Sequence, residues 1–317
     1  MRFIIHIGLI LFVGLLNAQQ QAPSLANYLD PYRMNLANCG LQSKYQACLS
    51  YRDQWTGIEG RPVTTMFSLS GPVKQFQGAA GCFITHEQLG LHQATSMMFS
   101  YSQVFPMDFL LLSVGGGLGY EYGKWGGRDI RTPDGVYDSG GFDHKDPNLI
   151  IGSLNSNTVS FQPSIYLQSN WIEWGIDLNL PLLQFNQPVL NFYKKNYSLR
   201  SVLIKEFNVK NFSFYSHFFF ISDFVQFQTE IMSRVIINGN VFGGINLRGY
   251  NSSAFDGIGL FFGFKLNQKI WLNYGIELPL NELKDQISGL NQEFGLKYEW
   301  NSGYRDKRKP VIYNPRW

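Results

Sequence analysis

The feature of this sequence that most constrains its fold is a repeated alternation of apolar and polar residues. The clearest case is the segment EFGLKYEW at 293–300, in which the even-numbered positions are apolar and the odd-numbered positions are charged or glycine. Successive side chains of a β-strand point to opposite faces, so this alternation separates an apolar face from a polar one. A chain built from such segments requires an apolar environment on one side only.

Fourteen segments follow this pattern, some strongly and some weakly. They are 45–51, 64–69, 78–85, 93–104, 109–122, 159–167, 172–180, 197–207, 212–220, 224–237, 241–248, 258–266, 270–278 and 293–300. Many approach the ~10 residues with which a tilted strand crosses a bilayer. Inward positions such as Tyr166, Phe261 and Trp271 are bulky, which favours a filled interior over an open one.

The connections between these segments differ in length on the two sides. With both chain ends on one side, the connections on that side are short, whereas those on the other side include the long segments 123–157 and 181–196. Outer-membrane barrels show this asymmetry, with tight periplasmic turns and long outer loops. We therefore predict an all-β fold, a transmembrane antiparallel outer-membrane β-barrel of about 14 strands. The alternative is a soluble β-sandwich, which the aromatic residues near strand ends and the even strand count disfavour.

The first residues have the features of an export signal. Arg2 precedes the apolar run 3–16, and Leu16-Asn17-Ala18 stands before Gln19 as a cleavage site. The run is shorter than the ~20 residues of a spanning helix, which disfavours the alternative of a membrane anchor. We expect four regions: a signal peptide at 1–18, an N-terminal periplasmic segment at 19–42, the transmembrane barrel at 43–301 and a basic, aromatic periplasmic tail at 302–317.

Catalytic and metal-binding motifs are weak in this sequence. The net charge of +3 does not indicate a nucleic-acid partner, and Cys39, Cys48 and Cys82 do not form a disulfide framework. The group Asp143, His144 and Asp146 in the longest loop resembles a weak cation site, but a solvated polar loop is the simpler interpretation. We expect no catalytic residue, no cofactor and no metal; an outer-membrane enzyme is the disfavoured alternative.

Two segments resemble a known family. The stretch YRDQWTGIEGRPVT at 51–64 and the tail KPVIYNPRW at 309–317 are similar to the PorP/SprF family of type IX secretion outer-membrane proteins. The residues that match the family pattern are Tyr51, Arg52, Gln54, Trp55, Gly57, Gly60, Pro62 and Thr64. The chain departs from the pattern at 35–40, where the family's second Asn-Pro and Ala-Tyr-Ala-Gly are replaced.

The resemblance implies a non-enzymatic component of the type IX secretion system in the outer membrane of a Gram-negative bacterium. Its partners would be secreted cargo, such as adhesins with C-terminal sorting domains, the secretion or gliding machinery, and outer-membrane lipid. The alternative is a passive porin or apolar-solute channel.

The candidate partner-binding residues lie at the two matching segments. They are Arg52, Gln54, Trp55, Arg305, Tyr313, Arg316 and Trp317. For the first segment, the alternative is a rigid rim turn, in which Arg52 and Asp53 pair. For the tail, the alternatives are a disordered end, a contact with a periplasmic partner, or a return into the barrel mouth.

Overall fold

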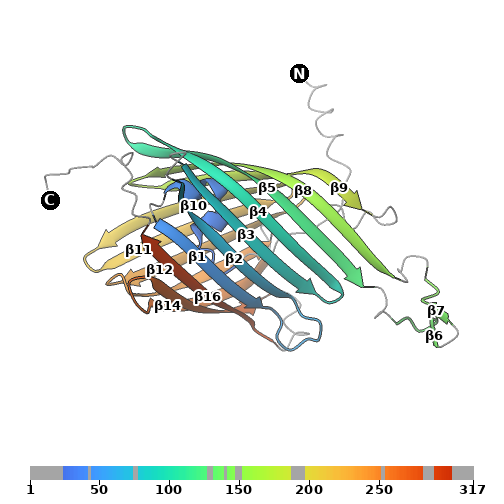
Figure 1. Cartoon of the computed structure of the whole chain (residues 1–317). Helices are drawn as coiled ribbons and strands as arrows, with labels where there is room; N and C mark the ends of the chain where they lie inside the picture. Colours follow the sequence, from blue (N-terminus) through green and yellow to red (C-terminus); the bar gives the residue numbers. More distant parts are fainter. Residues whose placement is uncertain are drawn as a thin grey trace, which may run out of the picture.

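The computed structural model describes residues 24–41, 44–73, 78–126, 131–138, 141–146, 152–186, 197–250, 254–280 and 289–301. Its dominant feature is a closed barrel of fourteen strands (Figure 1). The strands of the barrel are β1 (Lys44–Asp53), β2 (Val63–Val73), β3 (Gly78–Leu89), β4 (His92–Pro106), β5 (Leu110–Gly126), β8 (Ser153–Ser169), β9 (Glu173–Asn186), β10 (Ser198–Val209), β11 (Phe212–Ser222), β12 (Phe227–Ile237), β13 (Val241–Tyr250), β14 (Ala254–Lys265), β15 (Ile270–Pro279) and β16 (Asn291–Asn301).

All neighbouring strands of the barrel are antiparallel, and each strand pairs with the next barrel strand along the chain. The sheet closes where β1 pairs with β16, from Lys44 opposite Asn301 to Asp53 opposite Gln292. Closure leaves no strand edge unpaired, as a sheet in lipid requires. The predicted fold class is confirmed, and each of the fourteen predicted segments lies on a strand of the barrel.

The two ends of the barrel differ in their connections. One end, which we call the long-loop end, carries 54–62, 127–152, 187–197 and 280–290, together with the short connections 90–91, 223–226 and 251–253. The opposite end, the short-turn end, carries only connections of a few residues and holds the start of β1 and the end of β16. The long-loop end also bears a feature that the sequence analysis missed: strands β6 (Val136–Asp138) and β7 (Gly141–Asp143) form a hairpin that stands away from the barrel (Figure 1).

The outer surface of the barrel is apolar and the inner surface is polar. Large apolar side chains from many strands are exposed on the outside, among them Phe99, Leu118, Ile231, Phe262 and Phe294. The positions between them hold buried polar groups, which face the lumen. The face assignment made from the alternation is therefore confirmed, and the exposed residues provide the apolar band that contacts lipid.

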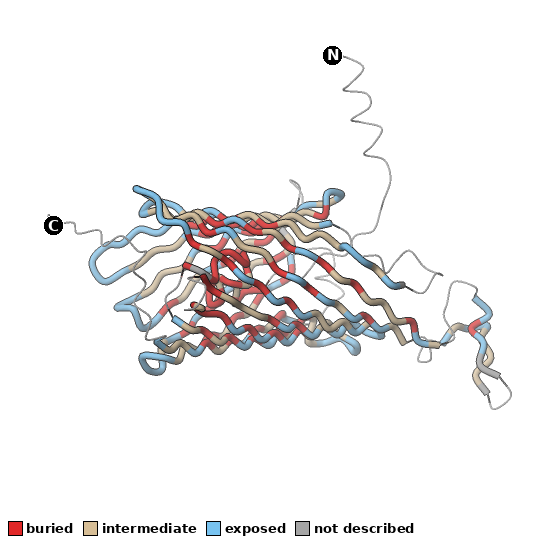
Figure 2. Tube along the Cα trace, turned by 45° about the horizontal axis from the view of Figure 1, so that its top comes forward, coloured by how far each residue is buried: buried red, intermediate tan, exposed pale blue. Residues whose placement is uncertain are grey.

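The lumen contains the N-terminal part of the chain, and most buried residues gather around it in the middle of the barrel (Figure 2). Residues 24–41, with the short helix α2 (Pro31–Met34) and the 3-10 helix η1 (Leu36–Leu41), lie inside the strands. The sequence analysis expected a periplasmic segment at 19–42. Its described part, 24–41, packs within the barrel, where Leu25, Tyr28 and Leu36 are buried away from water.

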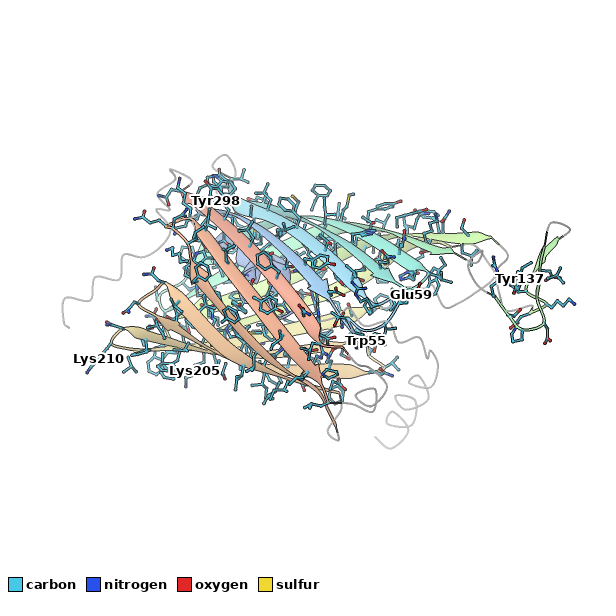
Figure 3. All side chains as sticks on the ribbon, turned by 90° about the horizontal axis from the view of Figure 1, so that it is seen from below. Trp55, Glu59, Tyr137, Lys205, Lys210 and Tyr298 are labelled. Carbon is cyan, nitrogen blue, oxygen red and sulfur yellow. The ribbon has the colours of Figure 1, made fainter. Side chains whose placement is uncertain are left out.

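The turn at 54–62 is a tightly bonded connection at the long-loop end, where Figure 3 shows Trp55 and Glu59. Trp55 adopts a positive φ of 55°, and its N–H donates to Asn291 Oδ1 at 3.0 Å. Asp53 pairs with Arg61 through two bonds of 2.5 and 3.1 Å, so the expected pairing of Asp53 with Arg52 is wrong. Neighbouring strand residues face opposite sides of the sheet, which keeps Arg52 and Asp53 apart.

Replacing Phe262 with Arg tests the face assignment. Phe262 is exposed on the outside of β14, and an arginine at mid-depth in lipid costs about 2–4 kcal/mol. We expect Phe262→Arg to reduce sharply the fraction of folded barrel, measured as the band that migrates faster on gels without heating. The inward control is Ala94→Arg, beside Glu87 and Glu121 in a luminal cavity. Equal yields for the two variants would contradict the assignment.

Gly295 would not serve as the inward control, although the alternation places it there. A Cβ at Gly295 would come within 1.9 Å of Asn273 Oδ1 and 3.2 Å of Leu29. A lower fraction of folded barrel in a Gly295 variant would therefore reflect crowding against residues 24–41. It would not show whether position 295 faces the lumen or the lipid.

Candidate functional site: a plugged lumen

The candidate functional site is the lumen, together with residues 24–41, which we call the plug. The plug and the wall share two buried apolar clusters. The plug supplies five of the thirteen members of the first cluster and half of the members of the second. In the first cluster, Tyr28 stacks on Phe261 at a ring distance of 4.5 Å and meets the edge of Phe242 at 5.4 Å. The guanidinium of Arg234 lies 4.9 Å from the centre of the Tyr28 ring, within cation–π range.

The second cluster forms around Tyr32 on the opposite side of the plug. Tyr32 meets Phe83 at 6.0 Å, and its hydroxyl is 2.8 Å from Ser100 Oγ. The wall has no side chain at Gly81, where a Cβ would come within 2.4 Å of the Tyr32 ring. The same holds at Gly117, where a Cβ would lie 2.8 Å from Leu36. These glycines let the backbone of the plug approach the wall closely, which gives a physical reason for Gly115 and Gly117 in β5; Gly116, between them, lies beside Phe161 instead.

Glu293 of β16 holds the N-terminal end of the plug. Its carboxylate accepts hydrogen bonds from the N–H groups of Leu25 at 2.6 Å and Ala26 at 3.1 Å, and from Ser24 Oγ. Glu293 is buried, so these charge-assisted bonds replace the water that a carboxylate otherwise requires. One side chain of the last strand therefore binds three groups near the start of the described chain.

Further polar contacts hold the middle of the plug. Buried Asp30 accepts a hydrogen bond from Ser68 on β2. Burial raises the pKa of the Asp30 carboxyl, and the nearby Arg33 opposes that rise. On the opposite wall, Arg200 donates to the carbonyl of Arg33 at 3.4 Å and pairs with Asp177 at 2.9 and 3.3 Å. The plug is therefore bonded to both sides of the lumen.

A group of buried charges lies in the lumen beside the Glu293 contact. Glu277 accepts from Arg248 at 2.5 Å and from Asn291 at 2.7 Å, and Arg52 lies 3.6 Å from the same carboxylate. Arg52 was a candidate for contact with a partner. The structure places its side chain inside the barrel, 2% exposed, where it contributes to the charge balance of the lumen. Gln54 is also buried, whereas Trp55 is partly exposed at the rim.

Two cavities flank the plug. One, of about 390 Å³, opens at the short-turn end and includes Glu173, Ile204 and Glu206 in its lining. The other, of about 160 Å³, lies toward the long-loop end and is lined by residues including Glu121 and Arg200. The plug occupies the space between these cavities.

The remaining sequence candidates are dispersed or lie outside the described residues. The candidates that lie outside the described residues are Arg305, Tyr313, Arg316 and Trp317. In the hairpin region, His144 Nδ1 is 3.0 Å from the Tyr137 hydroxyl, which also bonds to Thr132. Within the ranges that the structure describes, no three His, Cys, Asp or Glu side chains converge as metal ligands, and no helix is long and apolar enough to cross a membrane.

The most important residues that the sequence analysis missed are Glu293 and the wall glycines. Glu293 was recognised only as a member of the inward face of its strand. The available signal was the concentration of glycine at inward positions of β5 and β14, because an inward face with few side chains leaves room for another segment.

Labelling of Cys39 tests whether Glu293 holds the plug. The three cysteines are free thiols, and burial in the plug raises the pKa of the Cys39 thiol to about 12, so it reacts slowly. In a background with Cys48 and Cys82 replaced by Ala, we expect Glu293→Ala to accelerate maleimide labelling of Cys39 by on the order of tenfold or more. The reason is that the loss of charged hydrogen bonds costs about 2 kcal/mol.

The matched control is Glu299→Ala. Glu299 is also on β16, but its carboxylate pairs with Lys44 and Lys297 rather than with the plug. This variant should label at the wild-type rate. Unchanged labelling of Glu293→Ala in a folded barrel would show that the apolar contacts alone hold the plug.

Comparison with known proteins gives one family match. The model of the family described as type IX secretion system membrane protein PorP/SprF matches residues 17–298. No curated protein sequence matches the chain. Similar solved structures include a mutant of the monoaromatic hydrocarbon channel TodX (TM-score 0.48, 8% identity, covering 88% of this chain and 95% of that one). They also include the outer-membrane protein Omp33 of Acinetobacter baumannii (TM-score 0.42, 10% identity, 83% and 99%) and the KdgM porin (0.38, 7%, 80% and 99%).

These structural likenesses are too distant to bear on function. The family match, in contrast, extends over most of the chain, from before the plug to within the last strand. The matched range includes the segment 51–64, which carries the residues that resemble the family motif. The chain therefore belongs to the PorP/SprF family of type IX secretion system membrane proteins.

Proposed function

We propose that this protein is a non-enzymatic component of the type IX secretion system that handles particular cargo at the outer membrane. The cargo would be secreted proteins, such as adhesins with C-terminal sorting domains, which the barrel helps to export or to hold at the cell surface. A link to the periplasmic secretion or gliding machinery is part of the same proposal. The single observation that carries it is the family match over residues 17–298.

The plugged lumen supports a role other than free diffusion of solutes. A passive porin requires a continuous aqueous path, and its interior is a polar channel. Here two apolar clusters cross the lumen and join the plug to the wall. Packed side chains of this kind leave few voids larger than a water molecule, so we expect the closed state to exclude solutes.

Electrical recordings test this expectation against the porin alternative. In planar bilayers, the wild-type barrel should give little or no steady conductance. A variant that lacks residues 24–41 should conduct, because its wall remains closed by β1 and β16 while its interior is emptied. A large, stable conductance from the wild-type protein, equal to that of the shortened one, would support the porin alternative instead.

The proposed contacts with partners lie at opposite ends of the molecule. Trp55 stands in the turn at the long-loop end, which the expected topology places outside the cell. The tail, with Arg305, Tyr313, Arg316 and Trp317, follows β16 at the other end. Arginine and aromatic side chains are frequent anchors in protein interfaces. Arg52 and Gln54 are buried in the barrel, so in this proposal they support the turn and do not contact the partner.

Deletion of the gene tests the function. We expect the loss of export or surface retention of a small set of large proteins, while other type IX cargo is still secreted. The measurement is quantitative mass spectrometry of culture supernatant, cell surface and periplasm. Complementation with the wild-type gene should restore the pattern. An unchanged set of secreted proteins, with reduced uptake of a small solute, would contradict the proposal.

A further inference from the structure

The cavity at the short-turn end has a lining that selects for a particular kind of ligand. Its inner part is apolar, with Leu111 and Ile204, and Trp171 is exposed in its lining. Glu173 and Glu206 are in the lining as well. The cavity, of about 390 Å³, is large enough for several side chains of a peptide.

Both carboxylates are oriented by neighbouring side chains. Glu173 accepts hydrogen bonds from the Tyr166 hydroxyl at 2.6 Å and from Gln168 Nε2 at 2.9 Å. Glu206 accepts one from Asn208 Nδ2 at 3.0 Å. Each carboxylate keeps further lone pairs for a cationic donor.

Acidic side chains predominate in the lining. Asp108 adds a third carboxylate, and no lysine or arginine is among the described residues that line the cavity. The guanidinium of Arg234, on β12, lies over the rings of Tyr28 and Tyr215 and also attracts Glu206, which accepts a hydrogen bond from the Tyr215 hydroxyl. A cavity that combines apolar surface, an exposed tryptophan and several acids fits a basic peptide with aromatic residues.

The chain itself has such a segment next to the cavity. Residues 302–317, SGYRDKRKPVIYNPRW, contain five basic side chains and one aspartate, together with Tyr304, Tyr313 and Trp317. The segment follows Asn301, which lies at the short-turn end opposite Lys44, the first residue of β1. Its point of attachment and the cavity are therefore at the same end of the barrel.

The length of the segment is sufficient for it to reach the cavity. Sixteen residues extend to roughly 50 Å at about 3.3 Å per residue. Fourteen strands spaced about 4.8 Å apart and tilted by about 40° close into a barrel about 28 Å across. The tail can thus cross the mouth from β16 to β10 with residues to spare.

We propose that the tail 302–317 docks in this cavity, with its basic side chains on Glu173 and Glu206 and its aromatic side chains against Trp171 and Leu111. A tethered ligand of this kind binds at a high effective concentration even when each contact is weak. The inference does not depend on the proposed role in secretion.

A peptide titration tests the docking directly. The barrel is truncated after Asn301, its folding is verified by migration on unheated gels, and a fluorescent synthetic peptide of residues 302–317 is added in detergent. We expect saturable binding that weakens at higher salt and weakens at least tenfold in the double variant Glu173→Gln, Glu206→Gln. The matched control is Glu59→Gln, which removes an exposed carboxylate at the long-loop end and should leave the affinity unchanged.

Two comparisons decide between specific docking and general attraction of charges. A peptide of the same composition in scrambled order should bind much more weakly, and the full-length barrel should bind the added peptide more weakly than the truncated one, because its own tail occupies the cavity. Absence of binding, equal binding of the scrambled peptide, or insensitivity to the double variant would overturn the proposal. Equal binding by full-length and truncated barrels would also overturn it, and would assign the cavity to a basic peptide of another protein.

The single variant Glu206→Gln keeps the test valid if the double variant fails to fold. Glu206 is exposed, so its replacement leaves the packing of the wall unchanged. It should weaken peptide binding by several-fold, and an unchanged affinity would count against the docking.

Discussion

The structure depends on the pairing of β1 with β16. In a bilayer no water is present to bond with a free strand edge, so each backbone group of the sheet needs a partner within the protein. The seam between these strands provides it over ten residue pairs, from Lys44–Asn301 to Asp53–Gln292. Once the sheet is closed, the alternation of side chains divides the molecule into a surface for lipid and a separate interior. The composition of that interior then determines what the barrel does.

The interior is organised as a protein core and not as a channel. Apolar plug residues pack against inward aromatic residues, and several of the charges among them are paired or hydrogen-bonded, as with Asp177 and Arg200. Burying such pairs adds little stability, but removing one partner leaves a costly charge in the lumen. The arrangement therefore favours one position of the plug over many similar ones.

The strands could be predicted from the sequence, but the plug could not. Alternation is a local property, and the segment 293–300 reveals both its strand and its outward face without knowledge of any other residue. The bond between Ser24 and Glu293 joins residues 269 positions apart, and no local pattern specifies such a pair. Arg52 shows the same limit, because a match to a family motif did not reveal that its partner would be Glu277 inside the barrel.

Strand β16 makes two sets of contacts with residues near the start of the described chain. It supplies the partner for β1, and it carries Glu293, which holds the start of the plug. Residues from the two ends of the described chain therefore meet twice, once in the wall and once in the interior. Contacts of such large sequence separation form slowly and late. A barrel that closed without the plug would have to admit it afterwards through one of its two ends, whereas a wall that closes around the plug satisfies both sets of contacts together. Maturation of this protein in the membrane is accordingly a problem of timing as much as of stability.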